Sequence, residues 1–192
     1  MSGLVLRVSG WEILVAGEDG GDHLCQLRGK VKAGPRRVAA QVVAGDRVDW
    51  QPTEEGRGII EAIHPRHNSI SRVASGPRTV QQVMVANVDR FFVVVSVRQP
   101  ALRRGFVDRA LVVATSGGVK GVVVCINKID LDEEDDRHET TTLYRDLGYE
   151  VVETSAATGT GMAHLVDRFH EGLSVLVGPS GAGKSSILNA VE

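Results

Sequence analysis

The sequence predicts an all-β barrel followed by an α/β domain with a parallel sheet, and three observations carry this prediction. Residues 1–65 contain short apolar and β-branched runs separated by turn residues, without a helical period. From Phe91 onward, strand-like apolar runs alternate with segments at helical spacing. The chain has 192 residues, of which 42% are hydrophobic, so it is long enough for two small domains. We expect the barrel at 1–68, a linker at 69–87 and the α/β domain at 88–192.

The first part of the chain contains about five strand candidates. Their expected ranges are Leu4–Ser9, Trp11–Ala16, His23–Arg28, Arg47–Trp50 and Gly58–Ile63. Five short strands in so few residues suit a small closed barrel such as the OB-fold. An SH3-like barrel fits the same pattern nearly as well.

The second part alternates strands and helices. Strands are expected at Phe91–Val97, at Gly121–Ile126, from Val151 and at Leu173–Val177, with helices near 106–114, 132–147 and 162–169. Such alternation predicts a parallel sheet with helices on its faces. Ligands of these sheets bind beyond the carboxyl ends of the strands, which is where the motifs described below fall.

Composition favours a soluble cytoplasmic protein. No apolar run approaches the roughly 18 residues that a membrane span requires, and the N-terminal residues lack the layout of a signal peptide. The chain has two cysteines, Cys25 and Cys125, which we expect to be buried and reduced. The net charge of −2 does not by itself indicate a nucleic-acid-binding protein.

A basic loop follows the third expected strand of the barrel. Its cationic residues are Arg28, Lys30, Lys32, Arg36 and Arg37. A flexible basic loop on a barrel can follow a phosphate backbone, which makes these residues candidates for RNA binding. A solvated surface loop of common residues explains the same pattern, and the sequence leaves both interpretations open.

The strongest motif lies near the end of the chain. Gly178, Pro179, Ser180, Gly181, Ala182, Gly183, Lys184 and Ser185 match the phosphate-loop pattern G-x-x-x-x-G-K-[ST], and Ser186 follows. The glycines let consecutive backbone N–H groups face a phosphate, and the helix that starts there adds its positive end. We expect Lys184 to bridge the β- and γ-phosphates and Ser185 to bind Mg²⁺.

A second motif, Asn127-Lys128-Ile129-Asp130, follows the expected strand Gly121–Ile126 and indicates which base is bound. A carboxylate at Asp130 can accept hydrogen bonds from the ring N–H and the exocyclic amine of guanine. Adenine lacks this donor pair and would leave the carboxylate unpaired. The stem of Lys128 can lie along the base, and the amide of Asn127 can brace neighbouring loops.

Ser155 and Ala156 end the next expected strand. In guanine-nucleotide proteins a Ser-Ala pair at this place presents a backbone N–H to the carbonyl oxygen of guanine. A simple strand-to-helix turn would have the same residues, so the pair gains its value from its place between the other two motifs.

The order of the motifs is unusual, because the base-reading motifs precede the phosphate loop. In this the sequence resembles the circularly permuted GTPases, specifically the small-ribosomal-subunit-dependent assembly GTPases of the RsgA, YjeQ or EngC type. Further landmarks of the resemblance are the segments 45–50, 86–89 and 106–111. The resemblance implies an OB-fold domain and a permuted GTPase domain that binds GTP or GDP with Mg²⁺. It also implies stimulation by the small ribosomal subunit, contact with its rRNA, and action as a monomer away from membranes.

The same resemblance leads us to expect a longer protein. The switch threonine, the D-x-x-G segment and a zinc-binding domain would follow Glu192, so we expect zinc only there and an incomplete parallel sheet within these residues. We further expect this chain to bind guanine nucleotides without hydrolysing GTP efficiently. The alternative is a non-catalytic RNA-binding module with a structural nucleotide site. An ATPase of the transporter-subunit kind is disfavoured, because it would carry its phosphate loop early and lack the upstream N-K-x-D.

Overall fold

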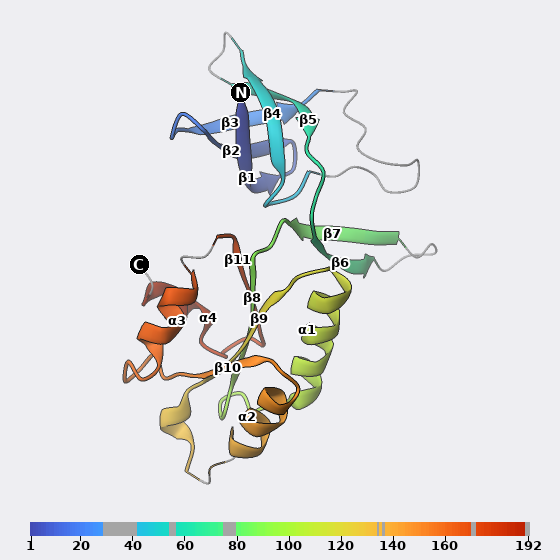
Figure 1. Cartoon of the computed structure of the whole chain (residues 1–192). Coiled ribbons are helices and arrows are strands. Elements are labelled where there is room, and N and C mark those ends of the chain that lie inside the picture. Colours follow the sequence, from blue (N-terminus) through green and yellow to red (C-terminus); the bar gives the residue numbers. More distant parts are fainter. Residues whose placement is uncertain are drawn as a thin grey trace. The chain divides into compact units, whose positions relative to one another are not determined.

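A computed structural model of the chain describes residues 1–28, 42–53, 57–74, 80–133, 135, 137–169 and 172–190. The chain divides into two compact units, Met1–Asn87 and Val88–Glu192. Figure 1 shows that the first unit is built of strands, whereas strands and helices alternate in the second.

Five strands of the first unit form a closed barrel. They are β1 (Ser2–Ser9), β2 (Glu12–Gly17), β3 (Asp22–Leu27), β4 (Arg47–Pro52) and β5 (Gly58–Ile63). Their order around the barrel is β1-β2-β3-β5-β4, with β3 and β5 parallel and β1 closing onto β4. This OB-like arrangement confirms the first of the two barrel types that the sequence allowed.

The barrel core is aliphatic except at its largest side chain, Trp50. Val5, Val15 and Ile60 are fully buried beside it. Gly58 at the start of β5 allows this packing, because a Cβ atom there would lie 2.4 Å from the Cys25 sulfur and 2.8 Å from the Trp50 ring. Cys25 and Cys125 are both buried free thiols, and burial raises the pKa of Cys125 to about 11.

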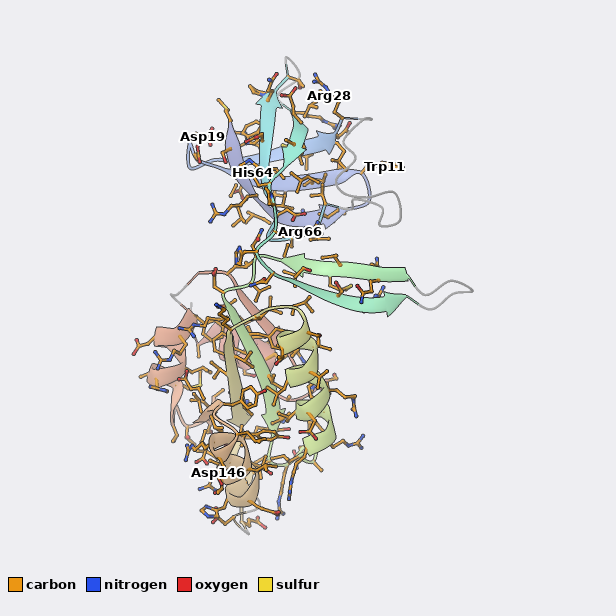
Figure 2. All side chains as sticks on the ribbon, turned by 45° about the vertical axis from the view of Figure 1, so that its right-hand side comes forward. Trp11, Asp19, Arg28, His64, Arg66 and Asp146 are labelled. Carbon is orange, nitrogen blue, oxygen red and sulfur yellow. The ribbon has the colours of Figure 1, made fainter. Side chains whose placement is uncertain are left out.

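The stretch expected as a linker, 69–87, contains an antiparallel hairpin of β6 (Ser69–Ala74) and β7 (Val80–Ala86). Long-range contacts link the residues just before and just after this hairpin to the segment that precedes β4. The buried carboxylate of Asp46 accepts hydrogen bonds from Arg66 Nε at 2.7 Å and Nη2 at 2.8 Å; Figure 2 labels Arg66 between the barrel and the hairpin. Asn87 donates to the carbonyl of Gly45 at 2.8 Å.

The second unit has a four-stranded sheet with the order β10-β9-β8-β11. Its elements are β8 (Arg90–Ser96), α1 (Arg104–Ser116), β9 (Gly121–Asn127), the short 3-10 helix η1 (Ile129–Leu131), α2 (Arg137–Asp146), β10 (Glu150–Glu153), α3 (Met162–Phe169), β11 (Ser174–Val177) and α4 (Lys184–Asn189). All three strand pairs are parallel. The predicted parallel sheet is therefore confirmed, with the strand that precedes the phosphate loop, β11, at one edge.

Both faces of this sheet are covered. Because alternate residues of a strand point to opposite faces, Phe92 and Val94 of β8 pack with Leu165 of α3 and Ile187 of α4. Phe91 and Val93, which alternate with them along β8, are buried as well, and Figure 1 shows α1 on the side of the sheet opposite α3. This layering fixes the carboxyl ends of the strands, where the loops of the site begin.

The helix expected at 132–147 is shorter in the structure, because α2 begins at Arg137. Asp135 has a left-handed backbone with φ of 54°, and the carboxylate of Asp132 is held by the side chain of Arg137. Both features prevent the helix from starting earlier. No helix in the described ranges has the length and apolar content to cross a membrane.

Candidate functional site

The phosphate-loop motif forms the turn between β11 and α4. Gly178 is required at its start, because a Cβ atom there would lie 2.2 Å from the carbonyl oxygen of Val94. Gly181 and Gly183 have φ values of 81° and 95°, in the left-handed region that favours glycine. Lys184 Nζ donates hydrogen bonds to the carbonyl oxygens of Gly178 at 2.8 Å and Pro179 at 2.9 Å, so its ammonium group lies over the loop.

Asn127 joins three segments that are distant in the sequence. Its side chain is buried and donates through Nδ2 to the carbonyl of Ala182 in the phosphate loop at 3.0 Å. Its Oδ1 accepts from the Thr154 hydroxyl at 3.1 Å and from the Ala156 backbone N–H at 3.4 Å. A Cβ atom on Gly183 would lie 2.2 Å from Asn127 Nδ2. The bracing role predicted for Asn127 thus has direct contacts in the structure.

The two segments proposed to read the base meet at Asp130 and Ser155. The Ser155 hydroxyl donates to Asp130 Oδ1 at 2.5 Å, and it also accepts from the Thr158 backbone N–H at 3.2 Å. The backbone N–H of Ile129 donates to the carbonyl of Thr154 at 3.2 Å. One carboxylate oxygen of Asp130 is therefore fixed, while the residue itself is exposed to solvent.

Lys128 has a contact that the motif did not predict. It adopts a left-handed backbone with φ of 60°, and its Nζ donates to the carbonyl of Gln99 at 2.5 Å. Gln99 lies in the loop between β8 and α1, and the next residue, Pro100, would be 3.5 Å from a Cβ atom on Gly181. The β8–α1 loop therefore contacts Lys128 and lies beside the phosphate loop, and nothing in its sequence identifies it as part of the site.

A cavity of about 320 Å³ lies where these loops converge. Six of the predicted residues line it: Asn127, Lys128, Asp130, Ala156, Gly183 and Ser186. Leu131 and Ala157 line it too and were missed, because apolar residues beside a motif carry no signal of their own. The other predicted residues of the phosphate loop, among them Pro179, Ser180, Lys184 and Ser185, lie in the adjoining turn and at the start of α4.

The surroundings of the cavity suit a nucleotide. Apolar walls with a few fixed polar groups are typical of small-molecule sites, and a loop with left-handed glycines presents backbone N–H groups to an anion. Ser185 is exposed at the start of α4 and could donate its hydroxyl oxygen to Mg²⁺. Within the described ranges, no three His, Cys, Asp or Glu side chains gather around a possible metal position.

Of the five basic residues predicted to contact RNA, only Arg28 falls in the described ranges. Its guanidinium forms an ion pair with Glu61 at 2.8 Å on the barrel surface, and Figure 2 labels it there. Lys30, Lys32, Arg36 and Arg37 lie outside the described residues.

Known proteins are similar to this chain in sequence and in fold. The family model described as RsgA GTPase matches residues 63–192. The Thermotoga maritima protein named small ribosomal subunit biogenesis GTPase RsgA is 37% identical to this chain over 194 residues. The match covers 99% of this chain and 60% of that protein. The protein of the same name from Haemophilus influenzae is 36% identical to this chain over 186 residues. That match covers 92% of this chain and 50% of the relative. The chain thus spans about half the length of the curated relatives it matches.

Solved structures are also similar to the chain. The crystal structure of YjeQ from Thermotoga maritima matches with a TM-score of 0.79 and 35% identity, covering all of this chain and 64% of the other. YloQ, described as a circularly permuted GTPase, matches with a TM-score of 0.72 and 27% identity. That match covers 98% of this chain and 63% of YloQ. The chain has its N-K-x-D and Ser-Ala motifs before the phosphate loop and an OB-like barrel in front of them. Together with the family model and the relatives, these features show that the chain belongs to the RsgA GTPase family.

Proposed function

We propose that this chain binds GDP and GTP with Mg²⁺ in the cavity at the carboxyl ends of its strands. We further propose that the whole protein hydrolyses GTP to GDP and phosphate during assembly of the small ribosomal subunit. The observation that carries the binding proposal is the convergence of Asp130, Ala156 and Gly183 on one cavity, although the three residues come from separate loops.

In this proposal the base lies in the cavity with its Watson–Crick edge toward Asp130. The free lone pairs of the Asp130 carboxylate accept hydrogen bonds from the ring N–H and exocyclic amine of guanine. The backbone N–H at Ala156 donates to the carbonyl oxygen of the base, and the stem of Lys128 covers one of its faces. The contact between Ser155 and Asp130 supports this arrangement, because it aligns the carboxylate before the base arrives.

The phosphates would occupy the turn between β11 and α4. Lys184 already lies across this turn, and its two carbonyl contacts would be exchanged for charge-assisted contacts to β- and γ-phosphate oxygens. Ser185 would contribute its hydroxyl to the Mg²⁺ shell. These roles make Lys184 the catalytic charge-stabilising group and Ser185 the magnesium ligand of the complete protein.

The partner in this proposal is the small ribosomal subunit, which the names of the relatives include. Two features of the barrel support a contact with its rRNA. The predicted basic loop includes Arg28 on the barrel surface, and Trp11 is 89% exposed at the turn between β1 and β2. An exposed indole offers a surface on which a base can stack; Figure 2 labels Trp11 at this turn.

We propose a monomer in the cytoplasm, and the names of the relatives, which include the small ribosomal subunit, support this location. We place the zinc site that the family resemblance implies outside these 192 residues.

The hydrolysis proposal is tested by phosphate release from the full-length protein with GTP and Mg²⁺. We expect turnover that rises when purified small subunits are added, that is not supported by ATP, and that is lost on replacing Lys184 by alanine. Large subunits are the matched control and should leave the rate unchanged. An equal rate with ATP, or no turnover in the presence of small subunits, would contradict the proposal.

A further inference from the structure

Arg137, the first residue of α2, connects two carboxylates that no sequence motif includes. Its Nη1 donates to Asp132 Oδ2, and its Nε donates to Glu153 Oε2 at 3.2 Å. A third carboxylate, that of Asp135, lies 3.4 Å from Nη1. These bonds, chiefly the one to Asp132, raise the pKa of the Arg137 guanidinium above its ordinary value.

The two main partners lie at opposite ends of the two proposed base-reading segments, one after the first segment and one before the second. Asp132 directly follows the η1 helix and lies two residues after Asp130. Glu153 is the last residue of β10 and lies two residues before Ser155. Arg137 therefore joins the end of one segment to the beginning of the other, while the Ser155–Asp130 hydrogen bond joins them at the cavity.

The surroundings make this connection rigid. The Asp132 side chain is fully buried, and those of Arg137 and Glu153 are 28% and 27% exposed. The Thr141 hydroxyl of α2 donates to the other oxygen of Glu153 at 2.7 Å. Removing the arginine would take away a cation that is paired with a buried carboxylate, a change that is strongly destabilising. The backbone attached to Asp132, and with it Asp130, would then shift.

We propose that Arg137 is a positioning residue for base selection, which holds the Asp130 carboxylate at the angle at which it accepts two hydrogen bonds from guanine. This inference rests on the proposed function. A hydrogen bond weakens steeply when its angle falls, so a displaced carboxylate weakens the bond to the exocyclic amine, which is the bond that distinguishes guanine from a base without that amine. Arginine suits the role because its planar fork reaches two carboxylates at once, which the single ammonium of lysine does not.

The test compares GDP with inosine diphosphate, whose base keeps the ring N–H and lacks the exocyclic amine. The ratio of their dissociation constants is measured by calorimetry for the wild type, Arg137→Ala and Arg137→Lys. A bond to a charged acceptor corresponds to at least ~10-fold in affinity. We therefore expect a wild-type preference for GDP of about that size, lost in the alanine variant and partly kept in the lysine variant. General destabilisation would weaken both nucleotides equally.

Arg104→Ala is the matched control. Arg104 of α1 also forms a two-bond pair with a glutamate, Glu139 of α2, at 3.0 and 2.5 Å, but it contacts neither base-reading segment. The ratio of the dissociation constants of Arg104→Ala for GDP and inosine diphosphate should equal that of the wild type. An unchanged ratio in both Arg137 variants, or an equal loss of both nucleotides, overturns the inference; if the alanine variant does not fold, the lysine variant decides. A wild type without preference for GDP instead overturns the proposed function on which the inference rests.

Discussion

Replacing Asp130 by asparagine is expected to weaken GDP binding by ~100-fold or more, because two hydrogen bonds to a charged acceptor are lost. The asparagine amide has one acceptor and one donor group, and its NH₂ would face the exocyclic amine of guanine. Xanthine carries a carbonyl oxygen in place of that amine. We therefore expect Asp130→Asn to bind xanthosine diphosphate more tightly than GDP, which competition against a fluorescent nucleotide measures.

The geometry around Asp130 favours this reversal over general damage. The Ser155 hydroxyl donates to Asp130 Oδ1, and the amide oxygen of asparagine can accept the same bond, so the side chain should keep its orientation. Asp146→Asn is the matched control, since Asp146 is exposed at the end of α2, away from the cavity lining (Figure 2). If Asp130→Asn still prefers GDP, the carboxylate does not read the base.

Replacing Lys184 by alanine is expected to weaken GDP and GTP binding by about 100-fold, because the charge-assisted contacts to phosphate oxygens disappear. Binding of guanosine, which has no phosphate, should stay unchanged. Calorimetric titration of the nucleoside and both nucleotides measures the difference.

Lys120→Ala controls for the loss of a positive charge, since Lys120 is exposed between α1 and β9. Equal weakening of guanosine and GDP by Lys184→Ala would mean that the variant disturbs the fold rather than the phosphate contacts. Measuring RNA binding by Lys184→Ala addresses the alternative, a non-catalytic RNA-binding module. If that alternative holds, the variant loses nucleotide binding but keeps RNA binding and still supports subunit assembly.

The motifs of the site could be predicted because their residues are contiguous. The phosphate loop needs glycines at fixed spacing, and Gly178, Gly181 and Gly183 each have the close approach or the left-handed backbone that requires one. The base-reading segments end strands β9 and β10, whose apolar runs are evident in the sequence. The adjacent parallel strands then bring these segments to one edge of the sheet.

The contacts between the loops could not be predicted in the same way. Only the folded chain brings these partners together: Lys128 with Gln99, and Arg137 with Asp132 and Glu153. The hairpin of β6 and β7 lies in the stretch that the sequence predicts as a linker, because two short strands give only a weak alternating pattern. Partners distant in the sequence stabilise it: Ala44 forms a β-bridge with Val85 of β7, and Asn87 donates a hydrogen bond to the carbonyl of Gly45.

The central claim is that base-reading and phosphate-binding loops in permuted order form one guanine-specific site. Displacement of fluorescent GDP from the 192-residue chain by GTP, GDP and ATP, with Mg²⁺ present, tests it most directly. We predict displacement by GTP and GDP at concentrations at least ~100-fold below that of ATP, because adenine leaves the Asp130 carboxylate unpaired. Equal displacement by ATP would contradict the claim, as would a folded chain that binds no guanine nucleotide.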